Sequence, residues 1–310
     1  MATAVWPQLS AAFACCSRES ACPANICTTA KDTGNTSDGD APPTQVINDQ
    51  AFRSRDLPSS SLALAVVGEG FDGEERPEQV LHGGARYAGQ WRGTLWHGRG
   101  TLKQSDGSQY QGQFYKGRKH GSGDFVDAAG NRYDGEWQQD RAHGHGKYMH
   151  VDGSQYEGEW YHDEKCGRGT ESWPDGSKYE GQFLHGIKHG AGSYWSAGGH
   201  KLYVGEFRQD RMDGDGTYTF SDGRTYSGQW QLGHIHGMGT MQWDTGLKYK
   251  GNFVQDIRHG EGTFVWPNGR VYQGQFKNGK QDGNGTLTDA NGKITRGEWR
   301  NGQRTFPPPD

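Results

Sequence analysis

The chain has 310 residues, and 51 of them are glycine, more than twice the usual share of about 7%. The net formal charge is −4, but the acidic excess falls within residues 1–80 and the remainder is close to neutral. A body without a basic stripe excludes nucleic acid as a partner, because phosphate binding needs clustered Lys and Arg. No run approaches the roughly 18 apolar residues of a membrane-spanning helix.

Residues 1–80 show no repeat and are rich in Ala, Ser, Thr, Asp and Pro. Such a composition buries too little apolar surface to offset the entropy lost on ordering, so we expect a disordered N-terminal tail. We place the folded part at 81–305 and a short C-terminal tail at 306–310. Only five of the glycines precede residue 81, which indicates that glycine has a positional role in the folded part.

Four of the five cysteines lie in the N-terminal tail, and Cys15 and Cys16 are adjacent. S-acylation of this pair would supply two lipid chains, which suffice for stable membrane anchoring where one is marginal. The alternative is a set of unmodified thiols in a reducing cytosol. The spacing of Cys15, Cys16, Cys22 and Cys27 fits no standard zinc pattern, so we expect no metal there.

A period of 23 residues dominates the rest of the chain, with a single step of 24. Each unit begins with Tyr-x-Gly-x-aromatic and continues through a short polar turn to x-Gly-x-Gly and then Asp-Gly or Asn-Gly. A fixed period of this length indicates a repeat array. The tyrosines that open the units are Tyr87, Tyr110, Tyr133, Tyr156, Tyr179, Tyr203, Tyr226, Tyr249 and Tyr272.

This motif resembles the MORN repeat (membrane occupation and recognition nexus). Nine units match well, and a tenth, with Thr295, Gly297 and Trp299, is degenerate. The resemblance implies an array that binds proteins or membranes, since similar arrays occur in junctophilins, radial spoke head proteins, plant phosphatidylinositol phosphate kinases, a lysine methyltransferase and apicomplexan budding scaffolds. In the kinases and the methyltransferase the catalytic part is a separate domain.

Within a unit the alternation predicts two strands. In the segment YEGEW, Tyr156, Gly158 and Trp160 share one face, while Glu157 and Glu159 point to the other. Asn-Gly and similar pairs predict the turns. We therefore expect an all-β fold, an elongated array of stacked antiparallel β-hairpins with one aromatic face and one polar face. At two strands of about 4.8 Å per unit, each repeat adds roughly 9–10 Å.

No predicted helix or second sheet covers the aromatic face, and a one-layer sheet does not leave a continuous apolar face in water. We expect strong curling that leaves an elongated groove partly open. Its occupant is predicted to be a protein partner, either an extended or helical peptide or a second copy of the array. The candidate groove residues are Trp173, Phe220, Trp243, Trp266, Tyr226 and Tyr249.

Histidines recur at one position of the repeat, but equivalent positions lie roughly 9–10 Å apart, too far for one metal ion to bridge. We expect these imidazoles to pack at the hairpin ends. They are His97, His120, His143, His189, His236 and His259, with Cys166, Asp213 and Asp282 in the same column.

Two rows of charge mark the polar side. An outward carboxylate row is predicted to be a solvated surface, and basic residues recur at the hairpin tips beside acidic ones. The tips could touch anionic lipid head groups, although their charge is mixed. The carboxylates are Asp134, Glu136, Glu157, Glu159, Glu180 and Glu206. The basic residues are Arg118, Lys119, Arg141, Lys165, Lys188, Arg211, Arg258 and Lys280.

The sequence contains no dinucleotide loop, Walker A motif, nucleophile elbow or kinase set, so we expect no enzyme and no cofactor. The favoured hypothesis is a cytoplasmic scaffold that binds a protein partner through the aromatic groove and can self-associate. The alternative is a tether that joins a lipid bilayer to cytoskeletal or ciliary partners through an acylated N-terminus and the basic tips.

Overall fold

The computed structural model describes residues 73–305. Predictions about the tail, including lipidation of Cys15 and Cys16, lie outside the described residues. The folded part begins before the predicted boundary at residue 81, because Glu74–Val80 form a strand, β1, that pairs with β2 (Arg86–Arg92).

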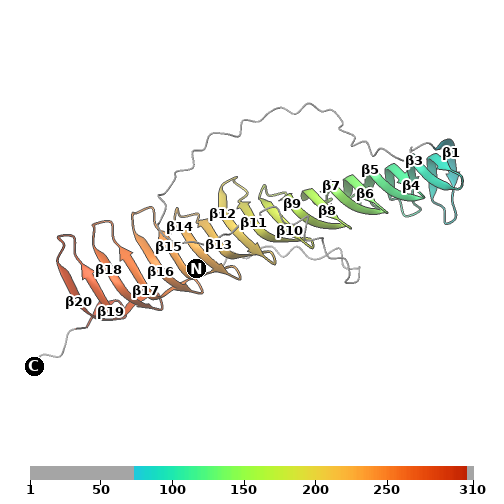
Figure 1. Cartoon of the computed structure of the whole chain (residues 1–310). Coiled ribbons are helices and arrows are strands. Elements are labelled where there is room, and N and C mark those ends of the chain that lie inside the picture. Colours follow the sequence, from blue (N-terminus) through green and yellow to red (C-terminus); the bar gives the residue numbers. More distant parts are fainter. Residues whose placement is uncertain (1–72, 306–310) are drawn as a thin grey trace, which may run out of the picture.

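The described residues form one sheet of 21 strands and contain no helix. Each strand pairs antiparallel with the next along the chain, so the sheet grows in sequence order into the elongated, twisted ribbon of Figure 1. The predicted array of antiparallel hairpins is confirmed. The remaining strands are β3 (Leu95–Lys103), β4 (Gln109–Tyr115), β5 (Arg118–Val126), β6 (Arg132–Gln138), β7 (Arg141–Met149), β8 (Gln155–Tyr161), β9 (Glu164–Ser172), β10 (Lys178–Leu184), β11 (Ile187–Trp195), β12 (Lys201–Arg208), β13 (Arg211–Thr219), β14 (Thr225–Gln231), β15 (His234–Gln242), β16 (Lys248–Val254), β17 (Ile257–Val265), β18 (Val271–Lys277), β19 (Lys280–Thr288), β20 (Ile294–Arg300) and β21 (Gln303–Arg304).

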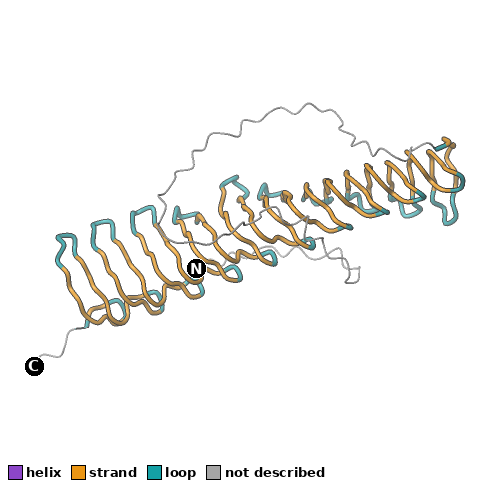
Figure 2. Tube along the Cα trace, viewed as in Figure 1, coloured by secondary structure: helices purple, strands orange, loops and turns teal. Residues whose placement is uncertain are grey.

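Two kinds of turn alternate along the ribbon (Figure 2). Within a repeat, two residues with positive φ join the strands, as at Asn278 (φ 50°) and Gly279 (φ 82°), the geometry of a type I′ hairpin turn. Between repeats, a five-residue loop such as 173–177 is closed by two backbone hydrogen bonds, from Trp173 N–H to Ser177 O and from Gly176 N–H to Trp173 O. The alternation places all inter-repeat loops along one long edge and all hairpin tips along the other.

A line of paired glycines runs across the middle of the strands. Gly158 lies opposite Gly169, and the ring of Tyr156 lies over this pair. A Cβ on Gly169 would lie 2.5 Å from the tyrosine ring, and one on Gly158 would lie 2.5 Å from the Cα of Gly169. The second glycine of each Gly-x-Gly, because it has no side chain, therefore leaves the space into which the tyrosine ring packs.

The first glycine of Gly-x-Gly belongs to a β-bulge in which the second strand carries extra residues. Gly167 has a φ of +58°, and the Glu159 carboxylate lies over it and accepts a 2.8 Å hydrogen bond from the Arg168 N–H. Glu136 does the same for the His145 N–H at 3.1 Å. Glu136 is exposed, as predicted, but Glu136 and Glu159 also each bind a backbone N–H that the bulge frees, and the sequence analysis did not foresee this role.

The core lies on the aromatic face and consists of one unbroken series of edge-to-face rings. Tyr156 contacts Trp160 of its own repeat, with ring centroids 5.1 Å apart, and Phe183 of the next repeat at 5.0 Å. All nine repeat tyrosines are at most 4% exposed. Because each tyrosine bridges two repeats, the rings join neighbouring hairpins into a single body.

Candidate functional site

Tyr226 and Tyr249 do not line an open groove. Both side chains are fully buried, and their hydroxyls donate to the backbone carbonyls of Gln229 (2.9 Å) and Asn252 (3.0 Å). Burial raises the pKa of Tyr249 to about 12. The prediction that these two rings face a partner is wrong, because each tyrosine lies flat over its glycine pair and is covered by the rings of adjacent repeats.

The other four predicted groove residues lie along one edge, three of them in consecutive repeats and the fourth, Trp173, separated from them by the loop that begins at Ser196. Each is the first residue of an inter-repeat loop, each is partly exposed, and each packs on the margin of the buried core. We call this row the aromatic shelf. It consists of Trp173, Phe220, Trp243 and Trp266.

The shelf is supported from below by the neighbouring aromatic column. Phe264 lies with its ring centroid 4.6 Å from Trp266 and 6.1 Å from Trp243, and Tyr218 supports Phe220 at 4.7 Å. In the other repeats the first residue of the loop is polar or small, so the shelf is concentrated in the C-terminal half of the array. Those positions hold Gln104, Asp127, His150, Ser196 and Asp289.

Four cations that the sequence analysis assigned to the hairpin tips in fact lie over the aromatic face. Lys119 Nζ is 4.1 Å from the ring centre of Phe125, and Lys188 Nζ is 5.1 Å from that of Trp173. Lys165 and Arg258 occupy the same column. Each of the four precedes the second glycine of Gly-x-Gly by four residues, so strand alternation would have placed it on this face.

One charged cluster interrupts the aromatic column. Glu171 stands where other repeats have Tyr, Phe, Leu or Met, and it is only 15% exposed. Its carboxylate lies 2.5 Å from Lys165 Nζ and 3.0 Å from Lys188 Nζ. Burial alone would raise the pKa of Glu171, but the two ammonium groups hold it below the usual value.

The acidic residues at the hairpin tips are tied to the backbone of the preceding repeat. The Asp163 carboxylate accepts a 2.7 Å hydrogen bond from the Ala142 N–H, and that of Asp256 accepts one of 2.7 Å from the Ile235 N–H. The basic tip residues Arg118, Arg141 and Arg211 are exposed. The tips therefore combine structural acids with exposed cations.

The histidine column packs at the hairpin ends. The ring of His143 lies 5.3 Å from that of Tyr161 and 5.6 Å from that of His162, and burial lowers the pKa of His143. Within residues 73–305, no group of three or more His, Cys, Asp or Glu side chains is arranged to hold a metal ion. The same residues include no helix long and apolar enough to cross a membrane.

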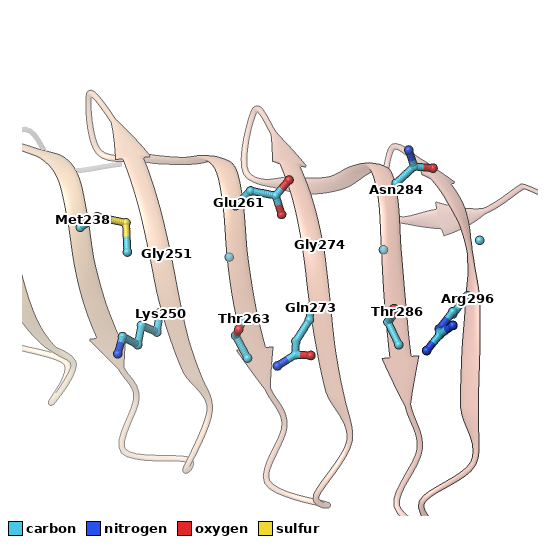
Figure 3. Close-up of a pocket in the computed structure, with 13 residues that line it drawn as sticks. Met238, Lys250, Gly251, Glu261, Thr263, Gln273, Gly274, Asn284, Thr286 and Arg296 are labelled. Carbon is cyan, nitrogen blue, oxygen red and sulfur yellow. The ribbon is translucent and has the colours of Figure 1, made fainter.

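A hollow of about 850 Å³ lies on the opposite, polar face, over β15 to β20. Figure 3 shows Lys250, Thr263, Gln273 and Thr286 on the successive strands β16 to β19 along this open trough, with glycines forming its floor. Glu261 and Arg296 place charges of both signs on its walls. The sequence did not reveal it, because alternation shows which side chains share a face but not where that face is hollowed.

A single open sheet of repeated hairpins, with a line of paired glycines under tyrosine rings, defines a class of β-hairpin repeat proteins. The MORN repeat profile matches ten segments of the chain, and the chain belongs to the MORN repeat family. The matched segments are residues 87–109, 110–132, 133–155, 156–178, 179–201, 203–223, 226–248, 249–269, 272–294 and 296–305. No curated protein matches the chain.

Similar solved structures include the TCP10 domain of Danio rerio CPAP in complex with a STIL peptide, at 12% identity and a TM-score of 0.37, covering 72% of this chain and 98% of that one. Another is the Drosophila melanogaster SAS-4 TCP domain with a proline-rich motif of Ana2, at 11% identity and a TM-score of 0.29, covering 58% and 85%. A streptogramin B lyase matches at 9% identity and a TM-score of 0.15, covering 74% and 84%. Scores this low carry no argument about function.

Proposed function

We propose that this protein is a non-enzymatic scaffold that binds a protein partner along the aromatic shelf. The observation that carries the proposal is the contrast between the repeat tyrosines, which are buried, and Trp173, Phe220, Trp243 and Trp266, which are partly exposed in a row. Trp and other aromatic side chains are enriched at protein interfaces and supply much of their binding energy.

The spacing of the shelf suits a peptide that runs along the array. Phe220, Trp243 and Trp266 occupy equivalent positions in three consecutive repeats, at roughly 9–10 Å per repeat. An α-helix advances about 10.5 Å in seven residues, so apolar side chains at i, i+7 and i+14 would meet three successive rings. An extended peptide in the polyproline II conformation would match the same step with every third residue, because its turn of three residues advances about 9.3 Å.

Partner capture by the full chain tests this proposal. Replacing Trp243 and Trp266 by alanine should abolish capture of the partner that the wild-type chain retains from its native cells. The matched control is Trp195→Ala, because Trp195 is also partly exposed but lies on the polar face between Lys178 and Lys201. Equal capture by the wild type and the double variant would remove the shelf as the binding surface.

Membrane tethering is a second proposal, and the exposed tip residues Arg118, Arg141 and Arg211 support it. Acylated Cys15 and Cys16 would hold the array at a bilayer while the cations face anionic lipid. Replacing both cysteines by serine should then release the protein to the cytosol. Continued membrane retention of that variant would count against acylation, and light scattering of the purified chain would show whether it also self-associates.

A further inference from the structure

Arg258 lies at the C-terminal end of the shelf. Its guanidinium carbon is 5.1 Å from the ring centre of Phe264, the ring that also supports Trp243 and Trp266. It is 5.6 Å from the ring centre of Tyr249 and thus sits against the buried core. A cation is therefore held over Phe264, the ring on which Trp243 and Trp266 of the shelf pack.

The Arg258 guanidinium carries little compensation for its charge. Its Nη2 donates a 2.8 Å hydrogen bond to the Gly279 carbonyl, and no carboxylate of residues 73–305 lies within 4.0 Å of it. The side chain is half-buried, and burial lowers its pKa. A guanidinium has five N–H donors, so donors remain for an acceptor from outside. A partly desolvated cation without a counter-ion favours binding of an anion.

The other cations of this column differ from Arg258, because each is either paired with a carboxylate or far from the shelf. Lys165 and Lys188 are paired with Glu171 at 2.5 and 3.0 Å, and Lys188 is also paired with Asp210 at 3.7 Å. Lys119 lies over rings in the N-terminal half, where no shelf residue flanks it. In three further repeats the position is apolar, at Ala142, Met212 and Ile235. Only at Arg258, within the described array, does an uncompensated cation of this column coincide with the shelf.

We propose that Arg258 binds a carboxylate of the partner, so that the shelf selects an acidic, amphipathic peptide. This inference rests on the proposed function and names the partner's chemistry. A carboxylate can accept two parallel hydrogen bonds from a guanidinium, and neighbouring apolar side chains of the peptide would cover Trp243 and Trp266. Arg270, 5.1 Å from the ring centre of Trp266, adds positive charge on the same side.

The test selects peptides on the purified full chain from a phage-displayed library of random linear peptides. Selected sequences should carry Asp or Glu next to apolar residues, and W243A with W266A should abolish their binding. Arg258→Gln should weaken binding of the selected peptide roughly tenfold to hundredfold, because it removes the charged partner. Lys119→Gln, which removes a cation of the same column away from the shelf, should leave it unchanged.

A charge swap provides a second test. The Arg258→Glu variant should bind a peptide in which lysine replaces the key acidic residue more tightly than it binds the unchanged peptide. Thermal melts show whether each variant is folded, and R258M, which keeps the apolar stem over Phe264, replaces R258Q if that variant melts early. Peptides that need Trp243 and Trp266 but show no acidic enrichment, or bind R258Q normally, would overturn this inference and leave the scaffold proposal intact.

Two other outcomes would overturn either the proposed function as a whole or the assignment of the anion to a peptide. If no selected peptide depends on the two tryptophans, the shelf is not a peptide site and the proposed function fails together with this inference. If instead the full chain binds phosphatidylserine vesicles and R258Q abolishes that binding, the anion is a lipid head group and the peptide assignment is wrong.

Discussion

The hydroxyl of Tyr156 donates a 2.9 Å hydrogen bond to the backbone carbonyl of Glu159, three residues further along the same strand. This bond holds the phenol ring flat against the sheet, where it covers Gly169 of the paired strand. The same bond recurs from Tyr87 to Gln90 and from Tyr272 to Gln275. The tyrosine and the two glycines of each repeat are thus parts of one packing unit.

Replacing Gly169 by alanine should lower the free energy of unfolding by about 1–3 kcal/mol, the usual range for an overpacked core. The added Cβ would lie 2.5 Å from the ring of Tyr156, which packs between Trp160 of its own repeat and Phe183 of the next. Urea denaturation of the full chain measures the change.

Gly198→Ala provides the control for that substitution. Gly198 lies in an inter-repeat loop, and its nearest neighbour to an added Cβ is the exposed His200 ring at 3.3 Å. This variant should be close to wild type. Equal loss of stability in both variants would mean that added backbone stiffness or solubility, and not the tyrosine contact, sets the effect.

Alkaline pH should unfold the array. Burial raises the pKa of all nine repeat tyrosines, to about 12 for Tyr87, Tyr249 and Tyr272. In the unfolded chain tyrosine ionises near pH 10. The stabilisation is therefore fully present below about pH 10 and is lost as the pH rises toward 12, because the unfolded state releases protons first.

The urea midpoint should accordingly be flat from about pH 8 to 9.5 and fall steeply above about pH 10. Removing one buried phenol, as in Tyr249→Phe, should reduce that slope while lowering stability at neutral pH by about 1 kcal/mol through loss of the bond to Asn252. A midpoint that is insensitive to alkali would show that the phenols are already accessible in the folded chain.

Strand alternation was sufficient to predict the hairpins and to place Tyr156, Gly158 and Trp160 on one face, because each strand is short and its pattern strict. It failed for Tyr226 and Tyr249, since sharing a face does not reveal whether a ring points outward or lies flat over a neighbouring glycine. The bulges were also missed. They depend on cross-strand hydrogen bonds such as Arg168 N–H to Glu159, which no local pattern encodes.

The aspartate at a hairpin tip has two roles, since it adopts a positive φ in the turn and its side chain accepts a backbone hydrogen bond. Asp163 has a φ of 72° and also accepts the Ala142 N–H of the preceding repeat. Asp163→Gly keeps the turn geometry and loses only the hydrogen bond, for about 1 kcal/mol. Asp163→Ala loses the bond and also strains the turn. The alanine variant should therefore be less stable than the glycine variant by about 0.5–1 kcal/mol.

Thermal denaturation of the two variants measures this difference. Repeats that have glycine at this position, as at Gly186, form the same turn without the side-chain bond, so the glycine variant is expected to fold normally. If alanine and glycine prove equal, the positive φ at the tip contributes nothing measurable, and the aspartate acts through its hydrogen bond alone.

Glu171 should be the most sensitive charged residue of the aromatic face. Glu171→Gln leaves Lys165 over the ring of Tyr156 without a counter-charge and leaves Lys188, over the ring of Trp173, with only Asp210 at 3.7 Å, so we expect a loss of about 1–3 kcal/mol. Because the two lysines hold the pKa of Glu171 below its usual value, its stabilisation is present above the unfolded pKa of about 4.3 and is lost as the pH falls through the lower folded value.

A triple variant that replaces Lys165 and Lys188 by methionine and Glu171 by leucine removes all three charges together, so it should recover most of the stability that E171Q loses. Recovery would show that the cluster is a self-compensated break in an apolar column. A triple variant no more stable than E171Q would instead mean that the ion pairs themselves hold β9 and β11 against their neighbours.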